Sequence, residues 1–192
     1  MFAGVGNNDG ISSYLKVRIS NDAGDMVTAY IGEGSSKTLS STWTSPFESD
    51  ALGKSQGLSK AGDAAQTATD MTSVTQFNSR MVWEGTTPPT LNLTLKFLAF
   101  SDPKTEVHDA IMLLEQMASP ELNKLTPGGR RPSTVTVDVG RRFKVSGLVI
   151  VDVSSELDPP RDKRGYMTRN TVQISLMPNQ MLNASEIPGL YL

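Results

Sequence analysis

The sequence predicts an α+β protein that is mainly β, with one principal helix and a long inserted arm or loop. Three observations lead to this class. Apolar and polar residues alternate in several short segments, apolar residues recur at helical spacing between Asp102 and Ser119, and residues 32–76 show neither period. A chain of 192 residues is long enough to bury a core, and it fits one domain with an extension or two small domains.

Residues 1–31 contain a predicted hairpin. Residues 14–19 alternate like a half-buried strand, residues 21–24 have turn-forming composition, and residues 26–31 return as a partner strand. We expect this hairpin to be the first part of a discontinuous domain.

Residues 32–76 differ in composition from the rest. Ser, Thr, Gly, Ala and Gln dominate, and Trp43, Phe47 and the other large apolar residues follow no period. Such a segment buries too little apolar surface to offset an ordering cost of about 1–2 kcal/mol per residue. Loops of this length are usually functional or disordered. We therefore expect an arm whose order depends on neighbouring chains.

The segment after the insertion contains two runs with strand periodicity. Residues 77–83 and 91–99 alternate between apolar and polar side chains. Residues 85–89, which include Pro88 and Pro89, interrupt the two runs. We predict that these runs pair with each other as a second hairpin.

The principal helix is predicted to follow residue 100. Asp102 can cap it and Pro103 suits its first position, whereas Ser119 and Pro120 end it. At about 1.5 Å per residue this helix is about 22 Å long, which suits it to lie across a sheet. Its apolar stripe consists of Val107, Ala110, Ile111, Leu114 and Met117.

The C-terminal part is predicted to be a meander. Residues 125–132 form a turn-rich connection, and residues 135–139, 143–153 and 172–176 form strands. In the long strand 143–153, Leu148 and Ile150 occupy the face opposite to Val145. Because both faces are apolar in its middle, we expect this strand to be covered on both sides.

Catalytic, cofactor and metal sites are not predicted. The only histidine, His108, falls within the helix and is interpreted as a partly exposed helix residue rather than a general base. The chain has no cysteine, which excludes disulfides, thiolate metal sites and cysteine nucleophiles. Residues 57–61 approach a nucleophile-elbow pattern around Ser59, but no strand precedes them and no helix signal follows.

The charge pattern gives no reason to expect a nucleic-acid or membrane partner. The formal net charge is −2, with both signs interspersed. Basic clusters at residues 130–131, 141–142 and 161–164 lack interleaved aromatic residues, so we interpret them as solvated or subunit-contacting edges. The sequence has no run of about 18 apolar residues and no export signal at its start, so residence in a cytoplasm is the default expectation.

Two blocks of the sequence carry a family resemblance. They are residues 81–100 with the helix 106–117, and residues 135–150 with 158–160, Gly165 and 172–176. This order resembles the tail-tube family of contractile phage tails, particularly the baseplate hub and tube-initiator proteins. The resemblance implies a split β-barrel with one flanking helix. In this interpretation residues 1–31 and 77–178 form one discontinuous barrel domain, 32–76 an inserted arm, and 179–192 a C-terminal strap.

What the resemblance implies for function is a structural and non-enzymatic role. Family members assemble into a ring, expected here to be six-fold, and DNA is expected only in passage through its lumen. The expected partners are copies of the same chain and other baseplate, hub and tail-tube proteins. The expected location is the baseplate of the virion, after assembly in the host cytoplasm. The insertion and the C-terminal strap depart from a plain tube subunit, which favours a baseplate or tube-initiator role over the tail tube protein itself.

Five apolar residues are candidates for subunit contacts because they have no evident place in a single-domain core: Trp43, Phe47, Trp83, Leu148 and Ile150. The alternative for each is burial in its own barrel, and for Leu148 and Ile150 the two interpretations stay equally open.

Three other functions remain as alternatives. The chain can be a monomeric soluble β-barrel binding module, or an enzyme such as a hydrolase using Ser59 or a carboxylate pair. It can also be a domain of a secretion or injection machine related to phage tails.

Overall fold

The structure, a computed structural model, describes residues 1–6, 9–44, 80–125 and 127–192. The chain divides into two compact units, one formed by Met1–Leu39 with Pro88–Leu192 and the other by Ser40–Thr87. The predicted insertion 32–76 therefore begins within the first unit. Its residues 45–76 lie outside the described part of the chain, as do residues 77–79 of the next predicted strand.

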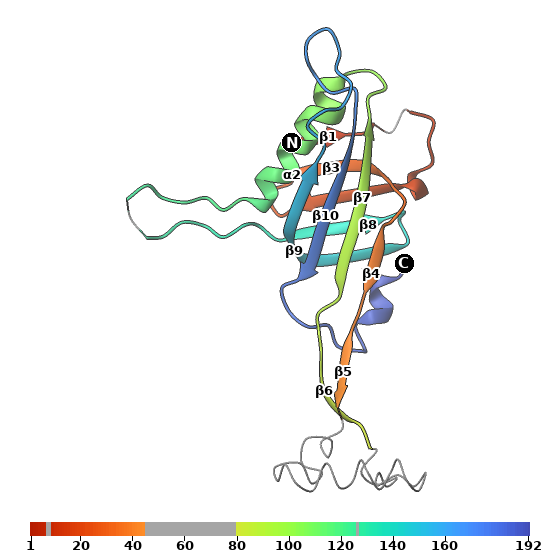
Figure 1. The fold of residues 1–192 in the computed structure, drawn as a ribbon, viewed down its shortest axis with the longest axis vertical. Helices are drawn as coiled ribbons and strands as arrows, with labels where there is room; N and C mark the ends of the chain where they lie inside the picture. The colour runs from red at the N-terminus through yellow and green to blue at the C-terminus, as the bar shows by residue number, and fades with distance from the viewer. Residues whose placement is uncertain (7–8, 45–79, 126) are drawn as a thin grey trace, which may run out of the picture. The chain divides into compact units, whose positions relative to one another are not determined.

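Among the described residues, six strands of the first unit form a closed antiparallel barrel (Figure 1). The last strand of the series pairs back to the first, which closes the barrel. This confirms the mainly β class with one principal helix. The strands follow the order β3 (Met26–Ile31), β2 (Lys16–Asn21), β8 (Val135–Val139), β9 (Phe143–Ser155), β10 (Arg169–Pro178) and β7 (Thr90–Leu98).

The predicted first hairpin is confirmed, since β2 and β3 pair antiparallel with Lys16 opposite Tyr30. Two further strands extend the sheet. β1 (Phe2–Gly4) lies parallel to β3, and β4 (Ser36–Thr38) pairs antiparallel with β7. The sequence did not predict them, because a three-residue strand is too short to show a period.

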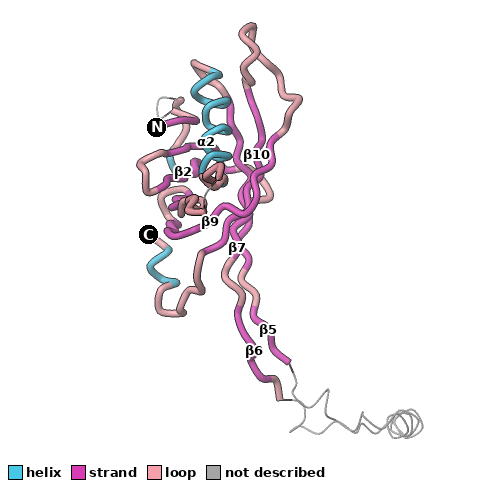
Figure 2. Tube along the Cα trace, turned by 90° about the vertical axis from the view of Figure 1, so that its left-hand side faces the viewer, coloured by secondary structure: helices cyan, strands magenta, loops and turns pink. Residues whose placement is uncertain are grey.

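Within the described residues, one helix of 15 residues packs against the barrel (Figures 1 and 2). It starts with a π-helical turn, η2 (Lys104–His108), and continues as α2 (Asp109–Ala118). Asp102 accepts hydrogen bonds from the Thr105 hydroxyl at 2.9 Å and from its backbone N–H at 3.4 Å. Every residue of the predicted apolar stripe is buried, which confirms the helical period.

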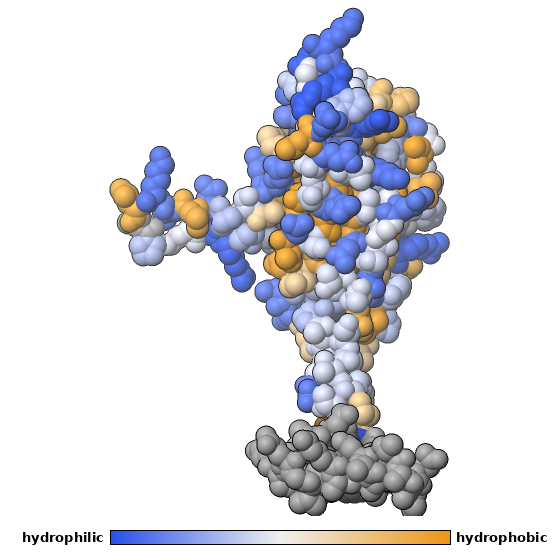
Figure 3. All heavy atoms as spheres, in the orientation of Figure 1, coloured by the Kyte–Doolittle hydropathy of each residue, from blue (hydrophilic) through white to orange (hydrophobic). Residues whose placement is uncertain are grey.

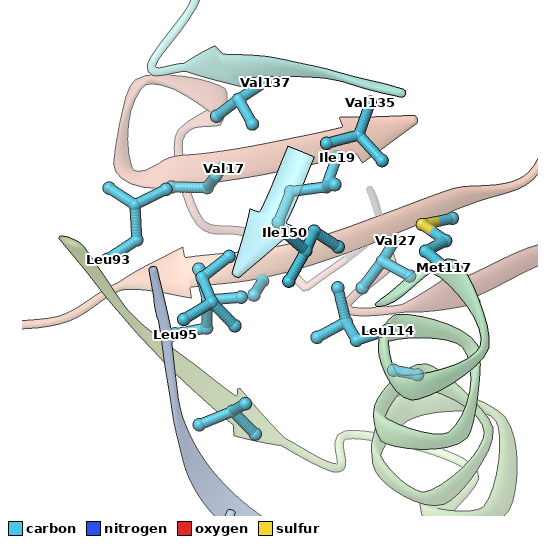
Figure 4. Close-up of a cluster of buried hydrophobic side chains, with 14 of the residues drawn as sticks. Val17, Ile19, Val27, Leu93, Leu95, Leu114, Met117, Val135, Val137 and Ile150 are labelled. Atoms are coloured by element: carbon cyan, nitrogen blue, oxygen red, sulfur yellow. The ribbon is translucent and has the colours of Figure 1, made fainter. Parts of the chain in front are cut away.

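The core lies between the barrel wall and α2 (Figure 4). Val27 of β3 lies beside Leu114 and Met117 of the helix, whereas Val17 of β2 lies beside Leu93 of β7 at the other end of the cluster. The same cluster takes in apolar side chains from β7, β8, β9 and β10. The helix therefore covers apolar surface that the strand residues present to it.

The predicted second hairpin is wrong. β6 (Val82–Thr86) pairs with β5 (Ser41–Thr44) in the second unit, whereas β7 pairs with β10, β3 and β4 in the first. Strand periodicity shows where a strand lies but not which strand is its partner. Here both runs pair with segments that are distant in sequence.

The predicted faces of β9 are also wrong. Val145 is opposite Val137 while Leu148 is opposite Val135, so β9 contains one residue more than β8 over this stretch. Gly147 accommodates the extra residue with φ at 72°. Because a one-residue shift exchanges the two faces of a strand, Val145 and Leu148 both point into the barrel and are buried.

A second bulge follows in the same strand. Ser175 of β10 is opposite Asp152, and Leu176 is opposite Ile150, so Val151 has no partner residue on β10. Ile150 is only 7% exposed, whereas Val151 is 57% exposed. The middle of β9 therefore has one buried face, and the expectation that it needs cover on both sides is corrected.

Gly147→Ala is expected to lower the free energy of unfolding by about 1 kcal/mol. An added Cβ would meet no atom within 4 Å, so the cost comes only from the left-handed backbone. Gly189→Ala is the matched control, because its site is equally open and its φ is not positive. Urea unfolding of both variants measures the difference, and equal effects at the two sites would contradict the bulge geometry.

The C-terminal residues 179–192 lie against the start of β9. Tyr191 forms a β-bridge with Phe143, and the two rings are 5.3 Å apart between centroids. The Lys37 ammonium donates a hydrogen bond to the Tyr191 hydroxyl at 3.0 Å and lies 4.8 Å from the centroid of the Phe143 ring. The Leu192 N–H donates to the Arg142 carbonyl at 2.9 Å. This segment is thus held to the barrel by contacts at its end.

Candidate functional site

The second unit, as far as it is described, contains a ribbon formed by β5 and β6. Trp43 and Trp83 are directly opposite each other in this ribbon and are 55% and 51% exposed. Met81 and Val82 next to them are also exposed. Tryptophan is among the residue types that contribute most to the centres of protein interfaces. The tryptophan pair is therefore a candidate contact surface.

Polar contacts stabilise the ribbon around the tryptophan pair. The Trp83 indole N–H donates to the Thr86 hydroxyl at 3.0 Å, and the Thr44 hydroxyl donates to the Glu84 carboxylate. The Thr87 N–H donates to the Ser40 carbonyl at 2.9 Å where the ribbon begins. These bonds leave about half of each indole surface exposed, and an isolated two-stranded ribbon is only marginally stable in water.

The five predicted contact residues have three different outcomes. Trp43 and Trp83 are exposed and lie together, as a contact surface requires. Phe47 lies outside the described residues. Leu148 and Ile150 belong to the core of the barrel, because the bulges in β9 turn both inward. For these two the structure shows the alternative left open above, burial in their own barrel.

A second exposed apolar surface was missed by the sequence analysis. Residues 119–125 and 127–134, here called the arm, project from the body between α2 and β8 (Figure 1). Two backbone hydrogen bonds between Glu121 and Arg130, of 3.0 and 2.7 Å, hold its two sides together. Leu122 and Leu125 near its end are 74% and 96% exposed. The signal available in the sequence was a long connection with large apolar residues and no period.

The lone histidine is an exposed helix residue, as the sequence analysis expected. The ring of His108 meets the ring of Tyr166 edge-on, with centroids 5.4 Å apart. Ser59 lies outside the described residues. Where the chain is described, no group of three or more His, Cys, Asp and Glu side chains is arranged to hold a metal ion.

An ion-pair network ties the loop before β10 to the start of the helix. The Arg164 guanidinium bonds to the carboxylates of Asp102 and Asp162, both at 2.9 Å. The hydrogen bond from Arg164, with that from Thr105, lowers the pKa of Asp102 to about 2. These ion pairs hold the loop against the start of the helix, so we assign Arg164, Asp102 and Asp162 a structural role.

A buried ionic cluster fixes the N-terminal segment. The Lys16 ammonium donates to the Asp9 carboxylate at 2.7 Å and to the Gly6 carbonyl at 2.8 Å, and the Tyr30 hydroxyl donates to the other Asp9 oxygen. The side chains of Lys16 and Asp9 are only 1% and 3% exposed. Burial opposes ionisation of Asp9, but the bonds from Lys16, Tyr30 and the Ile11 N–H outweigh it and lower the pKa to about 2. Burial and the bond to Asp9 raise the pKa of Tyr30.

Over the described ranges, no helix is both long enough and apolar enough to cross a membrane. Comparison of the chain with protein-family models finds no match, and neither does comparison with curated proteins. Two exposed apolar surfaces of the described chain are thus the candidates for contact with other molecules, the tryptophan ribbon and the arm.

Proposed function

We propose that this chain is a non-enzymatic structural subunit that associates with copies of itself into a closed ring. In this proposal the ring is a baseplate or tube-initiating layer of a contractile phage tail. The observation that carries self-association is the exposed Trp43–Trp83 pair. Soluble monomers rarely expose large apolar side chains side by side, and such a patch commonly marks a site of contact with another molecule.

The size of the expected contribution supports a contact role for the ribbon. Complete burial of an indole removes about 200 Å² from water, and about half of each tryptophan surface is still exposed. At about 25 cal/mol per Å² of apolar surface removed from water, covering the exposed part of each tryptophan contributes about 2 kcal/mol to the free energy of association. Two such residues, side by side, are enough to make an interface hot spot.

The assignment to a phage tail rests on the resemblance to the tail-tube family carried by residues 81–100 with the helix 106–117, and by residues 135–150 with 158–160, Gly165 and 172–176. A closed barrel with one helix against it is compatible with that architecture. The finer features, a tail-tube-like barrel and an insertion, residues 32–76, that reaches neighbouring subunits, are part of this proposal. So are passage of DNA through the lumen, contacts with hub and tail-tube proteins, and a location in the virion baseplate.

One observation favours a second candidate, a monomeric binding module. The core-facing side chains of β9, Val145, Leu148 and Ile150, are buried within its own barrel, so these residues do not need copies of the chain to cover them. In a monomeric module, the tryptophan ribbon would bind a different protein. The two candidates differ in whether the purified chain associates with itself.

The double variant Trp43→Ser with Trp83→Ser tests the proposal. We expect the unmodified chain to form rings, visible by negative-stain electron microscopy and by mass photometry. We expect the double variant to associate at least about a hundredfold more weakly, which corresponds to about 2.7 kcal/mol. The matched control is Leu98→Ser, an exposed apolar residue of the barrel, which should leave ring formation unchanged.

Circular dichroism checks in parallel that the variants are folded. Because the ribbon and the barrel belong to different compact units, the tryptophan substitutions should leave the barrel folded. If the unmodified chain stays monomeric at every concentration, the ring proposal is overturned and the binding module is favoured. If both variants weaken association equally, the tryptophan pair does not have the role assigned to it.

A further inference from the structure

The arm combines exposed leucines with positive charge. Leu122 and Leu125 are accompanied by Lys124, Arg130 and Arg131, against the single carboxylate of Glu121 in this part of the sequence. Figure 3 shows apolar side chains near the end of the arm among strongly hydrophilic ones. Such a surface matches a partner that is apolar and negatively charged.

The arm also extends away from the barrel to which it belongs, as Figure 1 shows. Its shape is nevertheless defined by the two backbone bonds between Glu121 and Arg130. Gly129 allows this close approach, since a Cβ at that position would lie 2.5 Å from the Glu121 carbonyl oxygen. A projecting element whose backbone is held by hydrogen bonds, and whose end exposes apolar side chains, is suited to bind another molecule.

A surface with the complementary character lies on the same chain. Six residues of β9 and of the loop after it are here called the acidic strip: half-buried Val149 and exposed Val151, Asp152, Glu156, Leu157 and Asp158. Val151 and Leu157 are 57% and 80% exposed, and the three acidic residues are exposed as well. No basic residue occurs between Val145 and Pro160 in the sequence, and a basic residue that contacts the strip is Arg161, whose guanidinium donates to the Leu157 carbonyl at 3.1 Å.

On β10, the neighbouring strand, an apolar surface borders the acidic strip. Val149 is opposite Met177 of β10, and the part of the sheet formed by these strands shows apolar side chains bordered by hydrophilic ones in Figure 3. The second bulge in β9 exposes Val151 beside Asp152, so the apolar and acidic groups alternate within one short stretch. Exposed apolar and acidic side chains on the strip are complementary to the exposed leucines and basic side chains of the arm.

We propose that the arm of one copy of this chain docks on the acidic strip of a second copy. This inference rests on the proposed function, and it adds a second contact between copies to the one assigned to the tryptophan pair. Because the arm and the strip are different surfaces, the contact is head-to-tail, and a head-to-tail contact closes into a ring if the rotation between copies permits. Arg130 and Arg131 meet the carboxylates, and the leucines cover the valines of the strip.

Cysteine cross-linking tests this docking directly, since the natural chain has no cysteine. A chain carrying Leu125→Cys is mixed with a mass-tagged chain carrying Val151→Cys under mild oxidation. We expect a disulfide-linked pair that contains one chain of each kind. The matched control replaces Val151→Cys with Leu15→Cys, which is similarly exposed but lies in the 3-10 turn Ser13–Leu15 before β2 and should give no cross-link.

Charge reversal supplies the second measurement. Arg130→Glu with Arg131→Glu in one chain, or Asp152→Lys with Asp158→Lys in another, should each weaken self-association about tenfold, because like charges then face each other. Mixing the two variants should restore association, because each reversed surface then meets its complement. The restored assembly should contain both chains in equal amounts.

The outcomes separate this inference from the proposed function. Rings without the Leu125–Val151 cross-link, or without rescue on mixing, overturn the docking of the arm and leave the ring subunit standing. Absence of any self-association overturns both. An equally strong cross-link to the Leu15→Cys control shows random collision and also overturns the inference.

Discussion

Ile150→Asp is expected to unfold the barrel, whereas Val151→Asp, one residue along, is expected to leave it folded. Ile150 is buried in the core cluster and Val151 is exposed, because the bulge beside β10 separates their environments. An unpaired carboxylate in an apolar interior costs several kcal/mol. That cost is comparable to the whole stability of a typical domain, about 5–15 kcal/mol.

Circular dichroism and thermal unfolding measure both variants under the same conditions. A folded Ile150→Asp protein would show that the register of β9 differs from the one described above. Loss of the fold in Val151→Asp would show the same. The folded Val151→Asp variant also provides a protein with an altered acidic strip and an intact barrel.

Lys16→Met is expected to lower the free energy of unfolding by about 3–5 kcal/mol. Removing the ammonium leaves the Asp9 carboxylate buried with the Tyr30 hydroxyl and the Ile11 N–H but without a cation. Replacing Asp9 as well, in the double variant Asp9→Leu with Lys16→Met, is expected to recover much of the loss, since no unpaired charge then remains. Denaturant unfolding of the two single variants and the double variant measures this coupling.

The exposed pair Arg164–Asp102 is the control for that cycle. Its side chains are about half exposed, and ion pairs of this kind are worth about 1 kcal/mol or less. Arg164→Met should therefore cost far less than Lys16→Met. Similar losses at the two pairs would contradict the role assigned to burial.

The pH dependence of stability provides a further readout of the buried pair. The pKa of Asp9 is about 2 in the folded chain and about 3.9 in an unfolded one. The stability that its ionised form contributes is fully present above about pH 4 and is lost as the pH falls toward 2. The slope between these values should be smaller in Asp9→Asn than in the natural chain.

Many elements of the fold follow from local pattern alone. The apolar stripe from Val107 to Met117 was identified in the sequence, and its side chains are buried. The alternation in residues 135–139 and 172–176 was also identified, and the apolar side chains of these two strands face the core. The hairpin β2–β3 follows from alternation on both sides of a turn. These predictions succeed because helix and strand periods involve residues that are close along the chain.

The candidate site was less accessible to this kind of reasoning. Trp43 and Trp83 could be named as candidates because they have no evident place in a single-domain core, but their pairing joins segments about 40 residues apart. Leu148 and Ile150 were candidates only because a strand without bulges would turn them outward. The arm lacked any periodic signal, so its exposed leucines went unnoticed.

Periodicity in the amino-acid chain was sufficient to locate the helix and most barrel strands, and the absence of cysteine excluded cysteine chemistry. Periodicity had a limit, which lies in how the strands associate. It did not specify which strands pair, since β6 joins β5 and β7 closes the barrel through contacts between distant residues. It also did not specify the faces of β9, where Gly147 and Val151 each shift the phase by one residue. The physical reason is that a side chain's environment depends on register between strands, which is set when the whole core packs.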